Sequence, residues 1–128
     1  MHRSRLGALV IDCQGGDLAA HGEFWSRALG YERETTSEAW AERYVNLAVP
    51  GDQARVLVQR VEHAPRVHID IETDDIAAEV ARLEGLGATV VDVRARWTVM
   101  QAPTGHRFCV VHPQRRDFAG APDVRVWR

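Results

Sequence analysis

The sequence predicts an α+β domain built from two βαβββ modules, whose curved mixed sheets surround a cleft for a small organic molecule. Three observations predict it. A β-type run, an acidic turn, an amphipathic helix and a Leu-Gly stop occur twice, over residues 6–31 and 66–88. Three further β-type runs follow each helix, and several strands carry one apolar and one mixed face. Two copies alone exclude a longer array of repeats.

The ends of both helices can be read from the sequence. A helix over 17–29 begins at Asp17 and ends at Gly30, because a carboxylate caps free N–H groups and glycine adopts left-handed backbone. A helix over 75–86 begins at Asp74 or Asp75 and ends at Gly87 in the same way. The apolar positions expected to pack are Leu18, Phe24, Trp25, Ala28 and Leu29 in the first helix, and Ile76, Val80, Leu83 and Leu86 in the second.

The remaining strands follow in order. We expect strands over 31–36, 42–48 and 54–61 in the first module and over 88–94, 97–101 and 107–112 in the second. The turns Pro50-Gly51-Asp52 and Pro103-Thr104-Gly105 separate the last strands of each module. The prediction is one domain over 1–128, with module one at about 5–61, module two at about 66–112 and a tail at 113–128 in which 124–126 forms a short edge strand.

Alternation along the strands assigns each side chain to a face. In the strand at 66–72, the apolar Val67, Ile69 and Ile71 should lie under the helix, opposite Arg66, His68, Asp70 and Glu72. In the first strand, Leu9 and Ile11 should point inward, opposite Ala8, Val10 and Asp12. In the strand at 54–61, Val56 and Val58 should point inward, opposite Arg55, Leu57 and Gln59. In the strand at 107–112, Phe108 and Val110 should point inward, opposite Arg107, Cys109 and Val111. The opposite faces are either solvated or a cleft, and their mixed composition favours a cleft.

Composition excludes several classes of protein. A net charge of -2 with scattered basic residues gives no surface for nucleic acid. The sequence has no apolar run long enough to span a membrane, and we expect the apolar stretch after its basic start to be a strand and not a signal peptide. Cys13 and Cys109 do not form a disulfide framework, so we expect a cytoplasmic protein, with Cys13 in the core.

Three segments carry a family resemblance: FWSRALG at the end of the first helix, VHIDIETDD at the strand and turn, and APTGHRFCVV at the last hairpin. Together with the duplicated βαβββ unit they resemble the vicinal oxygen chelate superfamily, especially its glyoxalase-like and bleomycin-resistance-like proteins, over residues 5–112. The resemblance implies sheets curved around a ligand pocket and a homodimer. Trp40 and Trp127, which the helix faces leave unexplained, add to the expectation of a homodimer.

Metal-dependent members of that superfamily hold a divalent ion with four side chains. By position the resemblance carries these to Ala8, Gln59, His68 and Cys109, with Gln59 fixed only to within two residues. Ala8 has no donor, Gln59 is a weak one, and a cysteine thiolate replaces the usual glutamate. Asp70 lies about 6–7 Å along the strand from His68, which makes it an awkward substitute. The expectation is therefore no cofactor and no stoichiometric metal, with a divalent metal as the alternative.

The candidate ligand-binding residues are His68, Asp70, Gln59, Cys109 and Trp97; no catalytic residue is assigned. His68 is either a ligand-facing acid–base group or a structural partner of Asp70 or Arg66. Cys109 is either a nucleophile or an inert apolar residue, and the second role is the more common one for a lone cysteine. Glu72 is expected to be solvated or paired with arginine, Asp70 stays open, and Trp97 is the best aromatic candidate.

Three functions compete at this point. The first is a metal-independent protein that binds a small molecule, for instance sequestering a drug or metabolite. The second is a divalent-metal-dependent lyase, isomerase or dioxygenase with substitute ligands. The third is a partner domain with a vestigial cleft. Ala8 separates the first two, because an enzyme of the usual metal type needs a donor there.

Overall fold

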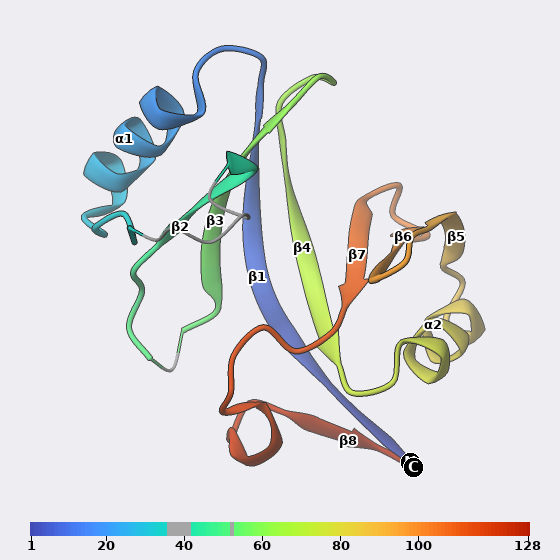
Figure 1. Cartoon of the computed structure of the whole chain (residues 1–128). Helices are drawn as coiled ribbons and strands as arrows, with labels where there is room; N and C mark the ends of the chain where they lie inside the picture. The colour runs from blue at the N-terminus through green and yellow to red at the C-terminus, as the bar shows by residue number, and fades with distance from the viewer. Residues whose placement is uncertain (36–41, 52) are drawn as a thin grey trace. The chain divides into compact units, whose positions relative to one another are not determined.

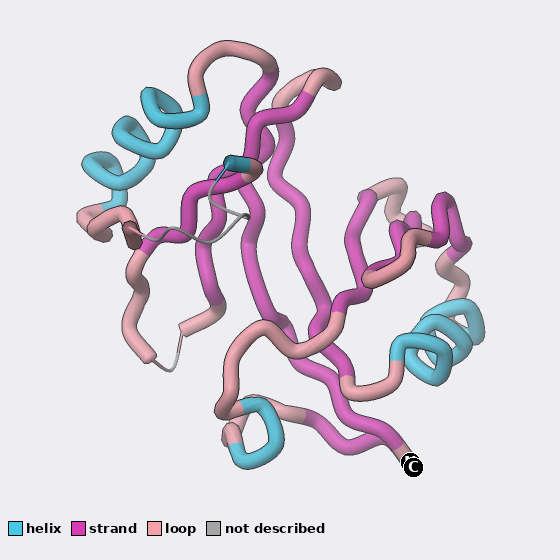
Figure 2. The backbone as a smooth tube through the Cα atoms, viewed as in Figure 1, coloured by secondary structure: helices cyan, strands magenta, loops and turns pink. Residues whose placement is uncertain are grey.

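A computed structural model describes residues 1–35, 42–51 and 53–128. Its elements in chain order are β1 (His2–Gln14), α1 (Leu18–Leu29), β2 (Tyr44–Leu47), β3 (Arg55–Val61), β4 (Arg66–Thr73), α2 (Ile76–Gly85), β5 (Thr89–Val93), β6 (Trp97–Gln101), β7 (Arg107–Val111), the short 3-10 helix η2 (Phe118–Gly120) and β8 (Arg125–Trp127) (Figure 1). The α+β class and the repeated order of a strand, a helix and further strands are confirmed (Figure 2).

Two compact units make up the chain. The first unit is Ala8–His68, and the second unit is Met1–Gly7 together with Ile69–Arg128. In the first unit the strands lie in the order β2-β3-β1, with β1 parallel and β2 antiparallel to β3. In the second unit the order is β4-β7-β6-β5, with only β4 and β7 parallel. The start of β1 belongs to the second unit, where residues His2–Ser4 pair with the expected C-terminal strand β8.

Both helices begin and end where the sequence predicts. Asp17 caps α1 by accepting from the Ala19 amide, and Gly30 ends it with φ 76°. Of the two candidate caps for α2, Asp75 is used, accepting from the Ala78 amide at 3.0 Å. Gly87 follows with φ 104°. Capping side chains and glycines close by in the sequence therefore account for these boundaries.

Each helix packs on a small apolar core. In the first unit, Trp25 of α1 packs with Ile11 and Cys13 against Leu47, Val56 and Val58. α1 approaches β2 closely at Gly22, where an added Cβ would lie 2.9 Å from Val45. In the second unit the core consists of Ala88, Met100, Phe108 and Val110, with Ile71, Ile76, Val80 and Leu83 against it. These contacts confirm the inward faces predicted for β3 and β7.

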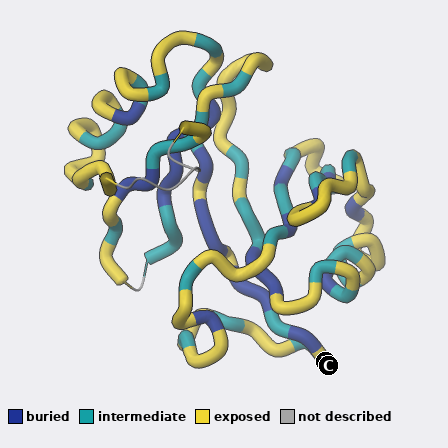
Figure 3. Tube along the Cα trace, viewed as in Figure 1, coloured by how far each residue is buried: buried dark blue, intermediate teal, exposed yellow. Residues whose placement is uncertain are grey.

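Six large apolar residues predicted to pack are exposed instead: Leu9, Phe24, Leu29, Val67, Ile69 and Leu86 (Figure 3). The reason is where the helices lie. α1 packs on β2 and β3, and α2 packs on β5, β6 and β7. Leu9 on β1 and Ile69 on β4 therefore lie outside the helices' footprint within their own units. Alternation predicts the face of a residue but not whether a helix covers it.

The predicted strand at 31–36 is wrong over its described part. Residues 31–35 form a single bridge, Arg33 to Leu47, rather than a strand. Two backbone hydrogen bonds, Glu34 N–H to Asn46 and Ala48 N–H to Glu32, still hold the segment beside β2. Residue 36 and Trp40 lie outside the described residues. In the part of the chain that is described, the helices are too short or too polar to span a bilayer.

Candidate functional site

The face of the first unit opposite α1 has an apolar centre. The register of β1 and β3 aligns Ala8, Val10 and Asp12 with Arg55, Leu57 and Gln59 in turn. Ala8, Val10 and Leu57 are buried together, with Tyr44 against them, in a cluster separate from the helix-side core. The alternation predicted for these two strands is therefore confirmed. Gln59 and Tyr44, which are register partners, stay partly exposed beside that centre.

Register also locates the positions that the resemblance assigns to metal ligands. In the second unit Cys109 lies opposite Asp70 on the neighbouring strand. In the repeat Asp70 corresponds to Val10, and Val10 lies opposite Leu57. The equivalent of Cys109 is therefore Leu57, whereas Gln59 lies opposite Asp12. The first unit thus offers Ala8 and Leu57, two buried apolar side chains, at these positions.

His68 pairs with an aspartate that sequence reasoning did not connect to it. Its Nδ1 lies 2.7 Å from Oδ2 of Asp12, and Arg66 Nε is 3.6 Å from the same oxygen. The Asp12 side chain is 1% exposed and that of His68 13% exposed. Because an ionised carboxylate can only accept, Nδ1 carries a proton in this contact. The expected partners were Asp70 and Arg66, and the residue that the sequence interpretation missed is Asp12, on the polar face of β1 in the same unit.

In the second unit, Asp70 and Cys109 belong to a face shared by β4, β7 and β6. Val99 is the partner of Cys109 on β6, and Trp97 is the partner of Val111. Trp97 is 38% exposed, so an aromatic surface is available there. Arg107 donates from Nε to Gln101 Oε1 at 2.9 Å. This face thus combines apolar and polar groups in the proportion typical of small-molecule sites.

Glu72 has a structural role, in agreement with the expected arginine pairing. The Arg5 guanidinium bonds Glu72 at 3.1 Å, Asp117 at 3.1 Å and Asp123 at 3.2 Å, and lies over the Phe118 ring. Burial alone would lower the pKa of Arg5, but hydrogen bonds to Asp117 and Glu72 raise it above its usual value. The guanidinium thus stays charged and ties the tail to β1 and β4.

Three donor side chains gather around β4. The imidazole of His68, the carboxylate of Asp70 and the thiol of Cys109 each offer a ligand atom within 4.8 Å of the others. The backbone spacing of His68 and Asp70 suggested that they were too far apart, but side chains on the same side of a strand can converge at their tips. Nitrogen, oxygen and sulfur together suit zinc better than magnesium or manganese. The four-position set of the superfamily does not fit this chain, since Ala8 and Leu57 have no donor.

Cys13 is a core residue, as expected. It packs against the helix-side core of the first unit, and burial raises the pKa of its thiol. A thiol of raised pKa forms little thiolate at neutral pH and is a poor nucleophile.

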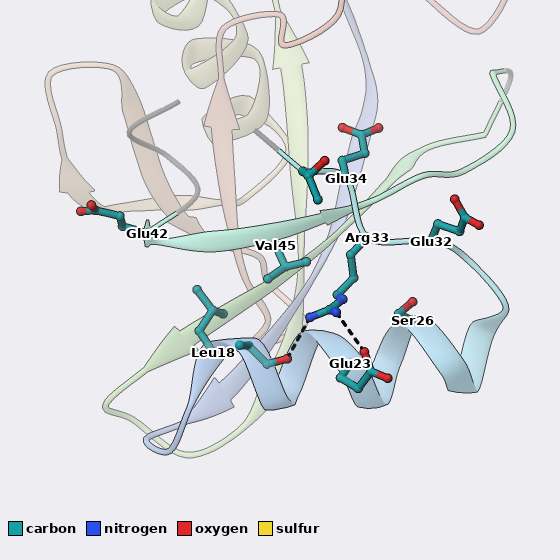
Figure 4. A pocket seen from close by; sticks show the side chains of 10 residues that line it. Leu18, Glu23, Ser26, Glu32, Arg33, Glu34, Glu42 and Val45 are labelled. Atoms are coloured by element: carbon teal, nitrogen blue, oxygen red, sulfur yellow. Dashed lines mark hydrogen bonds and ion pairs between the residues drawn. The ribbon is translucent and has the colours of Figure 1, made fainter. Parts of the chain in front are cut away.

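A cavity of about 680 Å³ lies between α1 and β2, outside every predicted site residue (Figure 4). Arg33 reaches across it, donating to the Ala19 carbonyl and pairing with Glu23 at 3.1 Å. The other charged lining residues are glutamates: Glu32, Glu34 and Glu42. The guanidinium thus serves to hold the segment after α1 against the helix.

Comparison with known proteins gives one family and several structures. A family model described as "Glyoxalase-like domain" matches residues 8–111. No curated protein sequence matches the chain significantly. A Streptomyces coelicolor methylmalonyl-CoA epimerase variant in complex with 2-nitronate-propionyl-CoA is 22% identical, with 86% of this chain and 94% of that chain covered and a TM-score of 0.59.

Two further structures are similar in fold. The methylmalonyl-CoA epimerase from Mycobacterium tuberculosis is 19% identical, with 91% of this chain and 92% of that chain covered and a TM-score of 0.58. A hypothetical protein from Bacillus halodurans is 11% identical, with coverages of 88% and 96% and a TM-score of 0.65. At these identities the likeness concerns the fold.

Proposed function

This chain belongs to the glyoxalase-like domain family of the vicinal oxygen chelate superfamily, and we propose that it binds a small organic ligand without a divalent ion at the superfamily's four ligand positions. One observation carries the proposal. The first unit supplies Ala8 and Leu57 where metal-dependent members supply two donors. A structural or catalytic metal needs three or more protein ligands, and two donors at these positions are too few.

The ligand would be held by shape, stacking and hydrogen bonds. The side chains proposed from the sequence to contact it are Gln59, His68, Asp70, Cys109 and Trp97. All five are partly accessible in the part of the chain that is described, beside apolar neighbours such as Val99 and Val111. Sequestration of a drug or metabolite in the cytoplasm, by a homodimer that uses neither nucleic acid nor membrane, is the form of the function we favour.

The experiment has two parts. Elemental analysis of the purified protein, prepared without chelator, should find less than one tenth of an equivalent of zinc, nickel, iron or manganese. Screening small organic molecules by ¹H–¹⁵N NMR should then perturb the resonances of Gln59 and His68 together. One equivalent of metal per chain, lost in His68→Ala, would contradict the proposal. Methylmalonyl-CoA belongs in the screen, because the similar epimerases are described with CoA esters or CoA analogues.

A second candidate function rests on the donors around β4. If His68, Asp70 and Cys109 bind zinc, the protein would be a metal-dependent lyase, isomerase or dioxygenase with a ligand set unlike that of its relatives. Bound zinc would supply Lewis-acid polarisation of a substrate oxygen. Zinc titration distinguishes the two candidates: His68→Ala and Cys109→Ser should each abolish stoichiometric binding if this second function holds.

A further inference from the structure

We propose that the group of the ligand lying against Asp12 is a hydrogen-bond donor, neutral or cationic, and not a carboxylate or phosphate. The inference rests on the proposed function and specifies the chemistry of its ligand. Asp12 is not one of the positions inherited from metal-dependent relatives, so it defines a contact of this chain's own.

The two oxygens of Asp12 are in different situations. Oδ2 is engaged by His68 at 2.7 Å and by Arg66 at 3.6 Å. Oδ1 is buried and has no hydrogen-bond partner among the described residues. A buried carboxylate oxygen without a donor costs free energy, because it has lost water and gained nothing in exchange. A ligand donor at Oδ1 would remove that cost.

A second unsatisfied acceptor lies on the same face of the first unit. Asn46 is buried on β2, and its register partner Leu57 lies opposite Val10. The Asn46 amide donates from Nδ2 to Glu34, which fixes its orientation, while Oδ1 has no partner in the described chain. The buried side-chain atoms left unsatisfied in the described part of this unit are thus both acceptors. The complementary ligand carries donors.

Charge on this face agrees with such a ligand. Gln59 is the register partner of both Asp12 and Tyr44, and it is partly exposed, as is Tyr44. The Gln59 amide therefore lies beside Asp12, and the Tyr44 ring lies one strand further along the same face. The cationic Arg66 is already paired with Oδ2, so an anionic ligand group at Oδ1 would meet a carboxylate.

Three probes of one shape test the inference. Benzamidine, benzamide and benzoate present a cationic donor, a neutral donor and an anion on the same ring. We expect millimolar benzamidine and benzamide to shift the ¹H–¹⁵N resonances of Gln59 and His68, and benzoate to bind at least tenfold more weakly. Asp12→Asn should reduce the affinity for benzamidine at least fivefold and change the affinity for benzamide by less than twofold. Asp92→Asn, which changes a partly exposed acid on β5, is the control and should alter the affinity for neither benzamidine nor benzamide.

The outcomes separate this inference from the proposed function. If benzoate binds this face as well as benzamidine does, or Asp12→Asn leaves benzamidine affinity unchanged, the inference is wrong while the binding function stands. If none of the three shifts Gln59 or His68, the inference is also wrong, and the function is judged by the wider screen. If the Asp12→Asn variant does not fold, the Asn46→Leu variant takes its place. That substitution should weaken the binding of benzamidine and of benzamide at least threefold.

Discussion

Glu79 is a buried carboxylate on α2 that receives hydrogen bonds from two elements. Arg82 donates to both of its oxygens, at 2.7 and 2.8 Å, and His2 lies 2.8 Å from Oε1. Burial alone would raise the pKa of Glu79, but hydrogen bonds from Arg82, His2 and Ser4 lower it below its ordinary value. The folded state therefore binds the Glu79 proton less tightly than the unfolded state does.

We expect Glu79→Gln to destabilise the protein by about 1–3 kcal/mol at neutral pH, because Arg82 and His2 lose a charged acceptor. Since the folded pKa is depressed, the contribution is complete above the ordinary glutamate pKa and disappears as pH falls through the folded pKa. Urea unfolding, repeated from about pH 7 down to about pH 3, should show the two proteins converging. The exposed Glu84→Gln on the same helix should show no such loss. A difference in the free energy of unfolding that does not change with pH would show that the ionisation of Glu79 does not contribute to stability.

Two glycines make a matched pair at the residue scale. A Cβ on Gly7 would lie 2.3 Å from Cγ of Glu72, whereas a Cβ on Gly85, at the end of α2, would meet nothing within 4 Å. Gly7→Ala should therefore cost about 1–3 kcal/mol through overpacking beside the Arg5 network. Gly85→Ala should be neutral or stabilise by up to about 1 kcal/mol. Thermal denaturation of both variants tests this, and equal melting temperatures would refute the close approach at Gly7.

At the scale of elements, β8 closes the second unit by pairing with the first residues of β1. The Trp127 indole N–H donates to Ser4 Oγ at 2.7 Å, and the Arg82 guanidinium lies 3.8 Å from the ring centroid. Trp127 therefore has a role within the chain. The sequence left core packing and a dimer interface equally open for Trp127, because a contact between residues 4 and 127 leaves no local signal.

Trp127→Ala should lower the free energy of unfolding by about 2–3 kcal/mol, since it removes ring packing, the cation–π contact and a hydrogen bond. Trp127→Phe keeps the ring and should cost about 1 kcal/mol. Trp97→Ala, at a partly exposed position, should change stability by less than about 0.5 kcal/mol. Chemical denaturation measures all three, and equal losses at Trp97 and Trp127 would contradict the role given to β8.

What the sequence could predict at this scale was local. Caps at Asp17 and Asp75, the glycine stops and the inward faces of β3 and β7 depend on neighbours along the chain, and these are confirmed. The exposure of Ile69 depends on where α2 packs, which alternation does not encode. At the site, the polar face of His68 was predictable, but its pairing with Asp12 was not, because 56 residues separate them in sequence.

At the scale of the whole molecule, the homodimer remains a prediction. The family resemblance still supports it, while Trp127 no longer does and Trp40 lies outside the described residues. We expect sedimentation velocity at micromolar concentration to show a species of twice the chain mass. A single 14.4 kDa species would count against the dimer.

The stability of the whole molecule should also report on metal. An ion that binds the folded chain and not the unfolded one stabilises it by about 2.7 kcal/mol at a hundredfold excess over its dissociation constant. Because Ala8 and Leu57 leave the superfamily's ligand set incomplete, we expect the melting temperature to be unchanged by EDTA and by millimolar magnesium or manganese. Zinc is the decisive ion, since His68, Asp70 and Cys109 match its preferences. A zinc-dependent rise of several degrees, absent in both His68→Ala and Cys109→Ser, would replace the metal-independent function with the metal-dependent one. A rise that persists in those variants would instead locate the zinc elsewhere and leave the proposal intact.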